Sequence, residues 1–339
     1  MDNEQNLMVP SLPSIMEFER KRNFENNKLF VVSPCHNEEA SICEFIDRVI
    51  SLKIIYQLIL IDDGSTDKTI LKIIGCQEKY SKIETSTQII LLELTRNFGK
   101  ESAMLAGLDY AKTKCDLLIL IDSDLQHPPE KIFEMITCWE KGAEIVTAVR
   151  DDRDSDSLLK EATASCFYKV FNHLVDSIKL QSGAGDFRLL SKPVINALTG
   201  MREFSRFSKG LVPWTGYKSV EVSYHHGFRY AGKSSWNALQ LWKYAIDGIF
   251  SFSVIPLKVW SLIGLTTSIL SLLYAIIVIL RTAFYGVDVP GYASLIVTIL
   301  FLGGIQLIGI GVLGDYIGRI YVDTKARPHY FIRSIHYRE

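Results

Sequence analysis

Three oxygen-bearing side chains follow one apolar segment of the chain at close spacing. The segment is Leu117–Ile121, and Asp122, Asp124 and Gln126 come after it, before a His-Pro-Pro break. Two carboxylates at positions i and i+2 converge on one point when the backbone bends between them. Hard oxygen ligands of this kind suit Mg²⁺ or Mn²⁺, which favour phosphate groups as further ligands. Because the pattern is short, a surface turn with two solvated aspartates is the alternative.

The segment Leu117–Ile121 has the length and the continuous apolar character of a buried parallel strand. Such a strand delivers the residues after it to the carboxyl edge of a sheet, where open α/β folds bind ligands. Similar segments are Lys28–Pro34, Tyr56–Asp62, Gln88–Leu94 and Ala143–Val149. Helical patterns separate them, and this alternation predicts an α/β fold with a mostly parallel sheet and helices on both faces.

Polar residues follow the other predicted strands and are expected at the same edge of the sheet. Asn37 and Glu38 come after the first strand, and the second runs into Asp63–Asp67. The glycine and hydroxyl residues of that turn suit a tight bend and a helix start. Lys100 begins another expected helix and could approach phosphate groups there, where charge and helix dipole act together. A solvated first-turn lysine is the alternative.

The pattern loosens between residues 150 and 230. Leu158–Val175 is expected to be helical, and Gly183–Arg188 reads as a flexible turn before a short apolar segment. Lys218–Tyr224 alternates between apolar and polar residues and predicts an edge strand. Arg229–Ser234 is expected to be a basic, flexible loop.

Composition limits the classes of function. The net charge is −1, so nothing indicates nucleic-acid binding. The six cysteines are scattered without a C-x-x-C pair, which suits a reducing compartment. The N-terminal 27 residues are polar and lack the apolar core of a signal peptide, so we expect a flexible tail there.

The last third of the chain contains two apolar runs without a charged residue, Val259–Leu280 and Gly291–Gly314. Each is long enough to span a bilayer, and a buried soluble helix is the alternative. The linker Arg281–Pro290 is short, so we expect a hairpin. Lysine and arginine residues flank its outer ends. By the positive-inside rule, a multi-pass protein of the inner (plasma) membrane is expected, with the catalytic domain and both termini in the cytoplasm.

An amphipathic segment, Trp236–Phe252, precedes the first run. Its apolar residues recur at helical spacing, with Lys243 and Asp247 among them, so a helix in the membrane interface is expected. An ordinary core-facing helix is the alternative. The expected organisation is a flexible tail (1–27), a catalytic domain (28–233), an interfacial region (234–257), a hairpin (258–314) and a basic cytoplasmic tail (315–339).

Seven motifs occur together and in order. They are VVSPCHNEE (31–39), IDDGSTD (61–67), RNFGK (96–100), DSDLQHPPE (122–130), GDFRLL (185–190), REFSRFSKGL (202–211) and DGIFSFS (247–253). With these motifs the chain resembles family 2 glycosyltransferases, which have the GT-A fold. The later motifs and the hairpin resemble polyprenyl-phosphate glycosyltransferases more narrowly. This subgroup contains bactoprenol glucosyltransferases and is related to dolichyl-phosphate mannose synthases.

The resemblance implies roles for individual residues. The residues implied for the nucleotide sugar are Pro34, Asn37, Glu38, Asp62, Asp63, Lys100, Asp122 and Ser123. Those implied for Mg²⁺ or Mn²⁺ are Asp122, Asp124 and Gln126, which would neutralise the diphosphate leaving group as the bond breaks. Capping of a helix N-terminus is the alternative for Glu38. Cys35-His36 replaces a more usual apolar-aromatic pair, and a polar edge contact is expected for His36.

The acceptor implied by the resemblance is a lipid monophosphate. Its second pKa is about 6 by analogy with phosphoamino acids, so it needs no strong base to attack the anomeric carbon. Asp186 occupies the family position near the acceptor and is a candidate catalytic base or orienting group. Candidate clamps for the phosphate, because guanidinium binds it bidentately, are Arg150, Arg188, Arg202, Arg206 and Arg229. A surface or headgroup role is the alternative for each arginine.

The expected activity is inverting transfer of glucose from UDP-glucose to undecaprenyl or another polyprenyl phosphate at the cytoplasmic membrane face. GDP-mannose is the alternative donor, and diacylglycerol or a glycan is the alternative acceptor. An inactive scaffold that recruits a flippase is the alternative of another class. Formation of a homo-oligomer is left open by the sequence. The chain has no Q-x-x-R-W motif and only two expected spans, which argues against a processive polysaccharide synthase.

Overall fold

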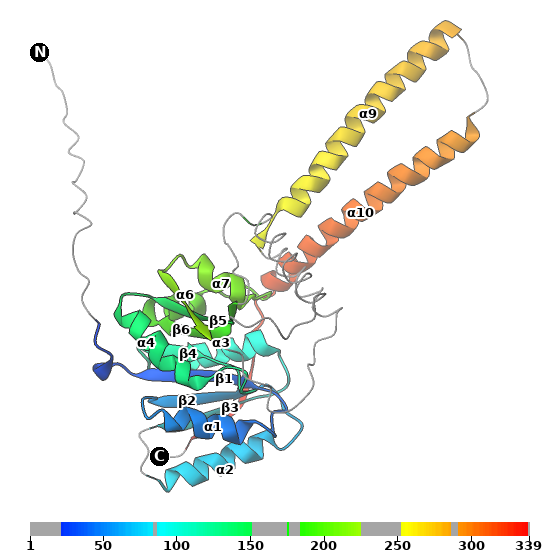
Figure 1. Ribbon diagram of the computed structural model, residues 1–339. Helices are drawn as coiled ribbons and strands as arrows, with labels where there is room; N and C mark the ends of the chain where they lie inside the picture. The colour runs from blue at the N-terminus through cyan, green and yellow to red at the C-terminus, as the bar shows by residue number, and fades with distance from the viewer. Residues whose placement is uncertain are drawn as a thin grey trace, which may run out of the picture.

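The computed structural model describes most of the chain (Figure 1). The described residues are 22–83, 87–150, 175, 184–224, 252–285 and 291–337. The helix expected at Leu158–Val175, except for Val175 itself, and the loop expected at Arg229–Ser234 lie outside them. So does the amphipathic segment Trp236–Phe252, apart from its last residue.

Four parallel strands form the centre of the sheet. They are β1 (Leu29–Cys35), β2 (Gln57–Asp62), β3 (Gln88–Leu94) and β4 (Leu117–Leu120). β1 pairs with β2 and β4, and β3 continues the sheet beyond β2. Their side chains are almost all buried, as expected for strands covered on both faces. The carboxyl ends of these strands therefore meet at one edge, as the sequence predicted.

The segment beyond β4 differs from expectation. β6 (Ala184–Ser191) lies antiparallel between β4 and β5 (Ile145–Arg150), so the flexible turn predicted at Gly183–Arg188 is wrong. Phe187 and Leu189 face one buried cluster and Leu190 the other, which explains why this segment is a strand. β7 (Ser219–Tyr224) pairs with β5 and is the predicted edge strand.

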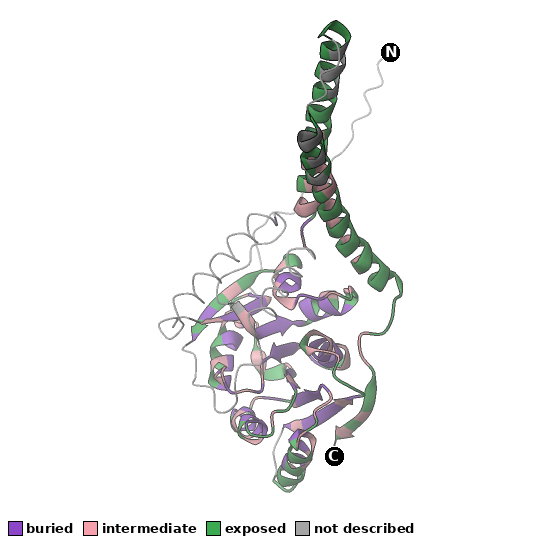
Figure 2. Cartoon of the chain, turned by 90° about the vertical axis from the view of Figure 1, so that its right-hand side faces the viewer, coloured by how far each residue is buried: buried purple, intermediate pink, exposed green. Residues whose placement is uncertain are grey.

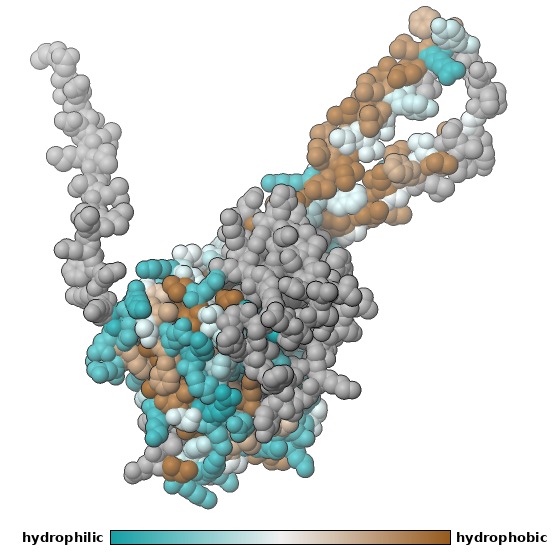
Figure 3. Space-filling view, viewed as in Figure 1, coloured by the Kyte–Doolittle hydropathy of each residue, from teal (hydrophilic) through white to brown (hydrophobic). Residues whose placement is uncertain are grey.

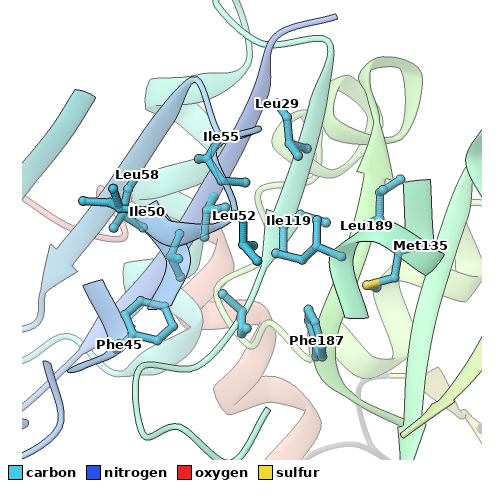
Figure 4. Close-up of a cluster of buried hydrophobic side chains, with 14 of the residues drawn as sticks. Leu29, Phe45, Ile50, Leu52, Ile55, Leu58, Ile119, Met135, Phe187 and Leu189 are labelled. Atoms are coloured by element: carbon cyan, nitrogen blue, oxygen red, sulfur yellow. The ribbon is translucent and has the colours of Figure 1, made fainter. Parts of the chain in front are cut away.

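Helices cover both faces of the sheet. On one face lie α1 (Ile42–Ser51), α2 (Thr69–Ser81) and α4 (Ile132–Glu140), which share a core with alternate strand residues (Figure 4). On the other face lie α3 (Lys100–Ala111), α6 (Lys192–Gly200) and α7 (Ser208–Trp214). Short 3₁₀ turns occur at Phe24–Asn26 and Pro129–Lys131. This arrangement confirms the predicted fold class.

The apolar runs form two long helices that project from the catalytic domain (Figures 1 and 3). They are α9 (Ile255–Tyr285) and α10 (Tyr292–Thr324). Both are long and apolar enough to cross a membrane, and the described large apolar side chains along them are mostly exposed (Figure 2). A helical hairpin with such a surface is compatible with a lipid environment, where apolar side chains need no protein cover.

The C-terminal tail returns to the catalytic domain. The basic cytoplasmic tail expected at 315–339 instead begins with the end of α10 and contains β8 (Ile332–Tyr337). β8 pairs antiparallel with β3, so the sheet order is β7-β5-β6-β4-β1-β2-β3-β8. At the other terminus, Arg22 forms an ion pair with Glu144 and lies over the Trp139 ring. The domain boundaries expected at 28 and 233 therefore leave out two segments that pack on the catalytic domain.

Candidate active site

Three charged side chains from distant parts of the sequence meet beyond the end of β4. Lys100 begins α3, Asp122 lies just after β4, and Asp186 lies on β6. The Lys100 Nζ atom is 2.8 Å from Asp122 Oδ1 and 2.6 Å from Asp186 Oδ2. The structure therefore brings together three residues that the sequence assigned separately to donor, metal and acceptor.

The charges of this cluster stabilise one another. Burial alone would lower the pKa of Lys100, but Asp186 and Asp122 raise it well above its ordinary value. Burial alone would raise the pKa of each aspartate, but the Lys100 charge lowers both. Opposite charges at such distances favour the ionised forms. At neutral pH the cluster therefore holds two carboxylates and one ammonium group.

Asp62 offers an unused acceptor at the end of β2. Its side chain is fully buried, and its Oδ2 atom accepts a hydrogen bond of 3.0 Å from the Ser65 backbone. Its Oδ1 atom has no hydrogen-bond partner among the described residues. Burial raises the pKa of this carboxyl group. A buried acceptor without a donor is costly, so this carboxyl group destabilises the fold when it is ionised.

The neighbouring predicted residues hold loops together. Asp63 accepts backbone hydrogen bonds of 2.7 Å from Phe98 and 2.9 Å from Gly99, which fixes the turn before α3. Asn37 has a φ of 57° and accepts a bond of 2.8 Å from the Thr66 backbone. These contacts place the loops after β1, β2 and β3 side by side.

Three more predicted residues take part in short local contacts. Glu38 accepts a bond of 2.7 Å from the Ser41 hydroxyl at the start of α1. Ser123 is buried, and its hydroxyl donates to the carbonyl of Pro34 at 3.2 Å. These contacts orient the backbone on either side of the β1 end. His36 makes the expected polar contact, with its Nδ1 atom 2.9 Å from the Asp63 carbonyl oxygen.

The predicted metal ligands form a compact oxygen-rich turn. Asp124 Oδ1 accepts the Gln126 backbone N–H at 3.0 Å, and Leu125 between them has a φ of 63°. Within the described residues, no group of three or more His, Cys, Asp or Glu side chains is placed to hold a metal ion. The predicted set has two carboxylates and one amide, and its hard oxygen atoms fit Mg²⁺ or Mn²⁺ by their chemistry.

The predicted arginine clamps have different surroundings. Arg188 is buried and donates to the carbonyls of Gly185 and Ser208 at 3.2 and 3.1 Å. Arg202 forms two hydrogen bonds of 2.7 Å with Asp109. Arg206 donates to the carbonyls of Met201 and Leu198. Arg150 ends β5 and is partly exposed, and Arg229 lies outside the described residues.

Sequence reasoning missed Glu101 and Lys209. Glu101 accepts bonds from the backbone N–H and the hydroxyl of Ser208, which ties α7 to the start of α3. This places the next residue, Lys209, close enough to Asp186 for its charge to lower the pKa of that carboxyl. Lys209 lies in the motif at 202–211, but its sequence position alone does not indicate a role. The role depends on the position of α7 beside β6.

The chain is similar to several known proteins. Residues 30–199 match the glycosyl transferase family 2 profile, and residues 255–320 match the GtrB C-terminal hairpin. A glycosyltransferase of Synechocystis is 45% identical over 91% of this chain and 95% of its own length. A bactoprenol glucosyl transferase of Shigella phage SfX is 43% identical, over 91% of this chain and 99% of its own.

The chain is also similar to two further proteins. A prophage bactoprenol glucosyl transferase homolog of Escherichia coli is 42% identical over 91% of this chain and 99% of its own. Among solved structures, glucosyl-3-phosphoglycerate synthase of Mycobacterium tuberculosis, in complex with Mn²⁺, UDP-glucose and phosphoglyceric acid, overlaps with a TM-score of 0.44. It is 18% identical and covers 67% of this chain and 79% of its own.

Proposed function

Since this chain belongs to glycosyl transferase family 2 and carries the GtrB C-terminal hairpin, we propose that it transfers glucose from UDP-glucose to a polyprenyl phosphate. The observation that carries the proposal is the match to bactoprenol glucosyl transferases over 91% of the chain, which includes both catalytic domain and hairpin. Undecaprenyl phosphate is the acceptor we propose, and a single inverting displacement is the reaction.

The donor nucleotide would bind at the ends of β1 and β2. The unused Oδ1 atom of buried Asp62 supports this placement, because a base N–H or ribose hydroxyl can donate to it. Asn37, Glu38 and Asp63 would shape this site through the loops that they hold, together with Pro34 and Ser123. Lys100 would meet the diphosphate, and its ion pair with Asp122, which we propose as a metal ligand at the donor site, supports this role.

Asp122, Asp124 and Gln126 would hold Mg²⁺ or Mn²⁺. When bound, such an ion supplies charge that stabilises the diphosphate as it leaves. The ionised state of Asp122 supports this assignment, because only a deprotonated carboxylate binds a divalent cation well. Asp124 would complete the set from the turn that its own hydrogen bond to Gln126 stabilises.

The acceptor phosphate would approach from the side of β6 and α7. A carboxylate with a lowered pKa is a weak base, and a phosphate dianion does not require one. We therefore assign Asp186 to orientation of Lys100 and the acceptor rather than to proton abstraction. Lys209 and Arg150 are the cations that we propose for the phosphate, since the buried guanidinium group of Arg188 donates to the carbonyls of Gly185 and Ser208. In this structure the guanidinium groups of Arg202 and Arg206 instead hold α3, α6 and the loop after it.

The hairpin would hold the catalytic domain at the cytoplasmic membrane surface. β8 follows α10 and pairs with β3, so the chain leaves and re-enters the same domain on the same side of the helices. This return supports an even number of spans, with both termini on the side of the catalytic domain. The basic residues on the outer flanks of the hairpin support a cytoplasmic side.

The experiment that tests this proposal is an organic-phase transfer assay. Purified protein in detergent receives labelled UDP-glucose, undecaprenyl phosphate and Mg²⁺ or Mn²⁺, with or without EDTA. Label should enter the lipid fraction only with both metal and lipid phosphate, and it should disappear in Asp124→Ala. Asp47→Ala, which removes a carboxylate that pairs with Lys79, is the matched control and should keep activity.

The alternatives are outcomes of the same assay. Transfer from labelled GDP-mannose, with none from UDP-glucose, would make the chain a mannosyltransferase. Transfer to diacylglycerol in place of the phosphate would change the acceptor class. A folded protein that transfers no sugar from any nucleotide donor, or that keeps full lipid glycosylation after Asp124→Ala, would overturn the proposal in favour of a membrane scaffold.

A further inference from the structure

A buried histidine lies behind the Asp122 carboxylate. The His127 Nε2 atom is 3.7 Å from Asp122 Oδ2, and its Nδ1 atom is 2.8 Å from the hydroxyl of Tyr224. His127 and Tyr224 are 8% and 3% exposed. Tyr224 ends the edge strand β7 and is 97 residues away in sequence. Three side chains, two from the loop after β4 and one from β7, therefore form a line that ends at Asp122.

Each ring nitrogen of His127 faces a polar partner in this line. An ionised carboxylate can only accept hydrogen bonds, so the Nε2 atom that faces Asp122 carries a hydrogen. The Nδ1 atom pairs with the Tyr224 hydroxyl at 2.8 Å, so both ring nitrogens face a polar partner. Each group in this order, from tyrosine to histidine to aspartate, has a partner of the required kind.

Packing holds the imidazole in this orientation. Its ring centroid lies 5.4 Å from those of both Phe187 and Tyr224. On another side, a Cβ atom added to Gly185 would lie 3.6 Å from His127 Cε1, so the backbone next to Asp186 also borders the ring. The aromatic contacts restrict ring rotation, and the tyrosine hydroxyl selects which nitrogen faces Asp122.

Asp122 is consequently approached from two sides. Lys100 lies against both of its oxygen atoms, at 2.8 and 2.9 Å, and His127 lies beyond Oδ2. Lys100 is a long side chain with four rotatable bonds, and it also pairs with Asp186. The packed His127 ring on the buried side can therefore fix the plane of the Asp122 carboxylate better than the flexible Lys100 side chain, which would move to meet a phosphate.

We propose that His127 and Tyr224 are positioning residues that fix the Asp122 carboxylate for binding of the divalent ion and the donor diphosphate. The inference rests on the proposed function, because it requires Asp122 to be a ligand at the donor site. It adds two residues that act through Asp122. Neither is expected to touch the sugar or the acceptor.

The test measures binding as well as turnover. Tyr224→Phe removes only the hydroxyl, and His127→Gln keeps an N–H donor of similar reach, whereas His127→Ala removes it. Mn²⁺ is titrated against a fixed concentration of UDP, and complex formation is followed by calorimetry and by the Mn²⁺ electron paramagnetic resonance signal. Loss of an outer partner of a metal ligand typically weakens metal binding by about 10-fold to 100-fold.

The inference predicts a graded result. Tyr224→Phe should raise the Mn²⁺ concentration for half-saturation by about 10-fold. His127→Ala should raise this concentration further, and His127→Gln should give a value between those of wild type and His127→Ala. Because Tyr224 acts on Asp122 through His127, Tyr224→Phe should cause little further loss of Mn²⁺ affinity in a protein that already carries His127→Ala. Tyr80→Phe is the matched control, since it removes a tyrosine hydroxyl that donates to Asp47 at 2.6 Å on helices α1 and α2. It should leave Mn²⁺ binding unchanged.

The behaviour of the wild-type protein distinguishes failure of this inference from failure of the proposed function. If wild-type protein binds Mn²⁺ with UDP and transfers glucose, while Tyr224→Phe and His127→Ala bind Mn²⁺ equally well, the positioning role is wrong. If the losses of Mn²⁺ affinity add up in the double variant, the two residues act separately through packing and the proposed action of Tyr224 through His127 is wrong. If folded wild-type protein neither binds UDP with Mn²⁺ nor transfers sugar, the proposed function fails and this inference with it. Should His127→Ala not fold, Tyr224→Phe and His127→Gln decide.

Discussion

The ammonium group of Lys100 lies 2.6 Å from the carboxylate of Asp186, although 86 residues separate them in the sequence. The same group is 2.8 Å from Asp122, so one lysine joins the side of the site that we assign to the donor with the side that we assign to the acceptor. A cation in this position can stabilise charge that develops on a leaving diphosphate.

Replacement of Lys100 should therefore affect turnover strongly. In Lys100→Met the aliphatic stem remains but the charge is lost, and we expect kcat to fall by about 100-fold to 1,000-fold, the range for loss of one preorganised charge-stabilising donor. Steady-state transfer to lipid phosphate measures this. Lys79→Met, which removes an exposed pairing with Asp47, is the matched control. A Lys100→Met protein with wild-type kcat would exclude the role in leaving-group stabilisation.

Asp62→Asn should separate binding from stability. The amide can accept from the Ser65 backbone with its oxygen, which leaves an NH₂ donor where the Oδ1 acceptor was. We expect the Kd for UDP to rise at least about 10-fold, as for loss of a charged hydrogen bond of roughly 1.5 kcal/mol or more. Calorimetry of UDP binding checks this, and unchanged affinity would place the nucleotide elsewhere.

The same substitution should raise thermal stability at neutral pH. Burial raises the pKa of Asp62, so its contribution to folding is fully present at low pH and is lost as pH rises through the folded-state pKa. The neutral amide removes that loss. Asp62→Asn should have a higher Tm than wild type at pH 7, with the difference shrinking as the pH is lowered. A lower Tm at pH 7 would contradict the assigned cost of the buried charge.

Asp109 should show the opposite pH dependence. Burial alone would raise its pKa, but Arg202 and Tyr330 lower it, so the charged form stabilises the fold. This stability is present above the unfolded-state pKa of about 3.9 and is lost as pH falls through the folded-state value. Asp109→Asn should therefore lower Tm at pH 7, and its difference from wild type should shrink as the pH falls below about 3.9. Asp47→Asn, at a side chain that is 40% exposed, is the comparison and should have a smaller effect.

Removal of the C-terminal strand should expose the edge of the sheet. A chain ending at Pro328 lacks β8, so β3 keeps unpaired backbone groups that invite pairing with another chain. We expect a lower Tm and concentration-dependent self-association, followed by light scattering in detergent. Arg333→Ala keeps β8 but removes an ion pair with Glu93 and a hydrogen bond to the Thr95 carbonyl, and it should lower stability less than the truncation does. Unchanged Tm and association after truncation would mean that β8 is dispensable.

Local patterns in the sequence determined much of this protein. The apolar segments that end at Asp62 and before Asp122 are strands, and the two uncharged runs are long helices. Such features are readable because length, apolar continuity and helix starts depend on neighbouring residues. The motifs around Asp122 and Asp186 likewise carry the resemblance to the family without reference to any tertiary contact.

Contacts between distant segments were decided only by the tertiary structure. The glycine-rich start of β6 resembles a turn, and it is a strand because β4 and β5 both offer it unpaired backbone. The tail becomes β8 for the same reason, at the free edge of β3. The meeting of Lys100 with Asp186, and of Tyr224 with His127, depends on where α3, β6 and β7 are placed in the sheet. Strand pairing and burial of charge are set by the neighbours that folding supplies, and these neighbours are not adjacent in the sequence.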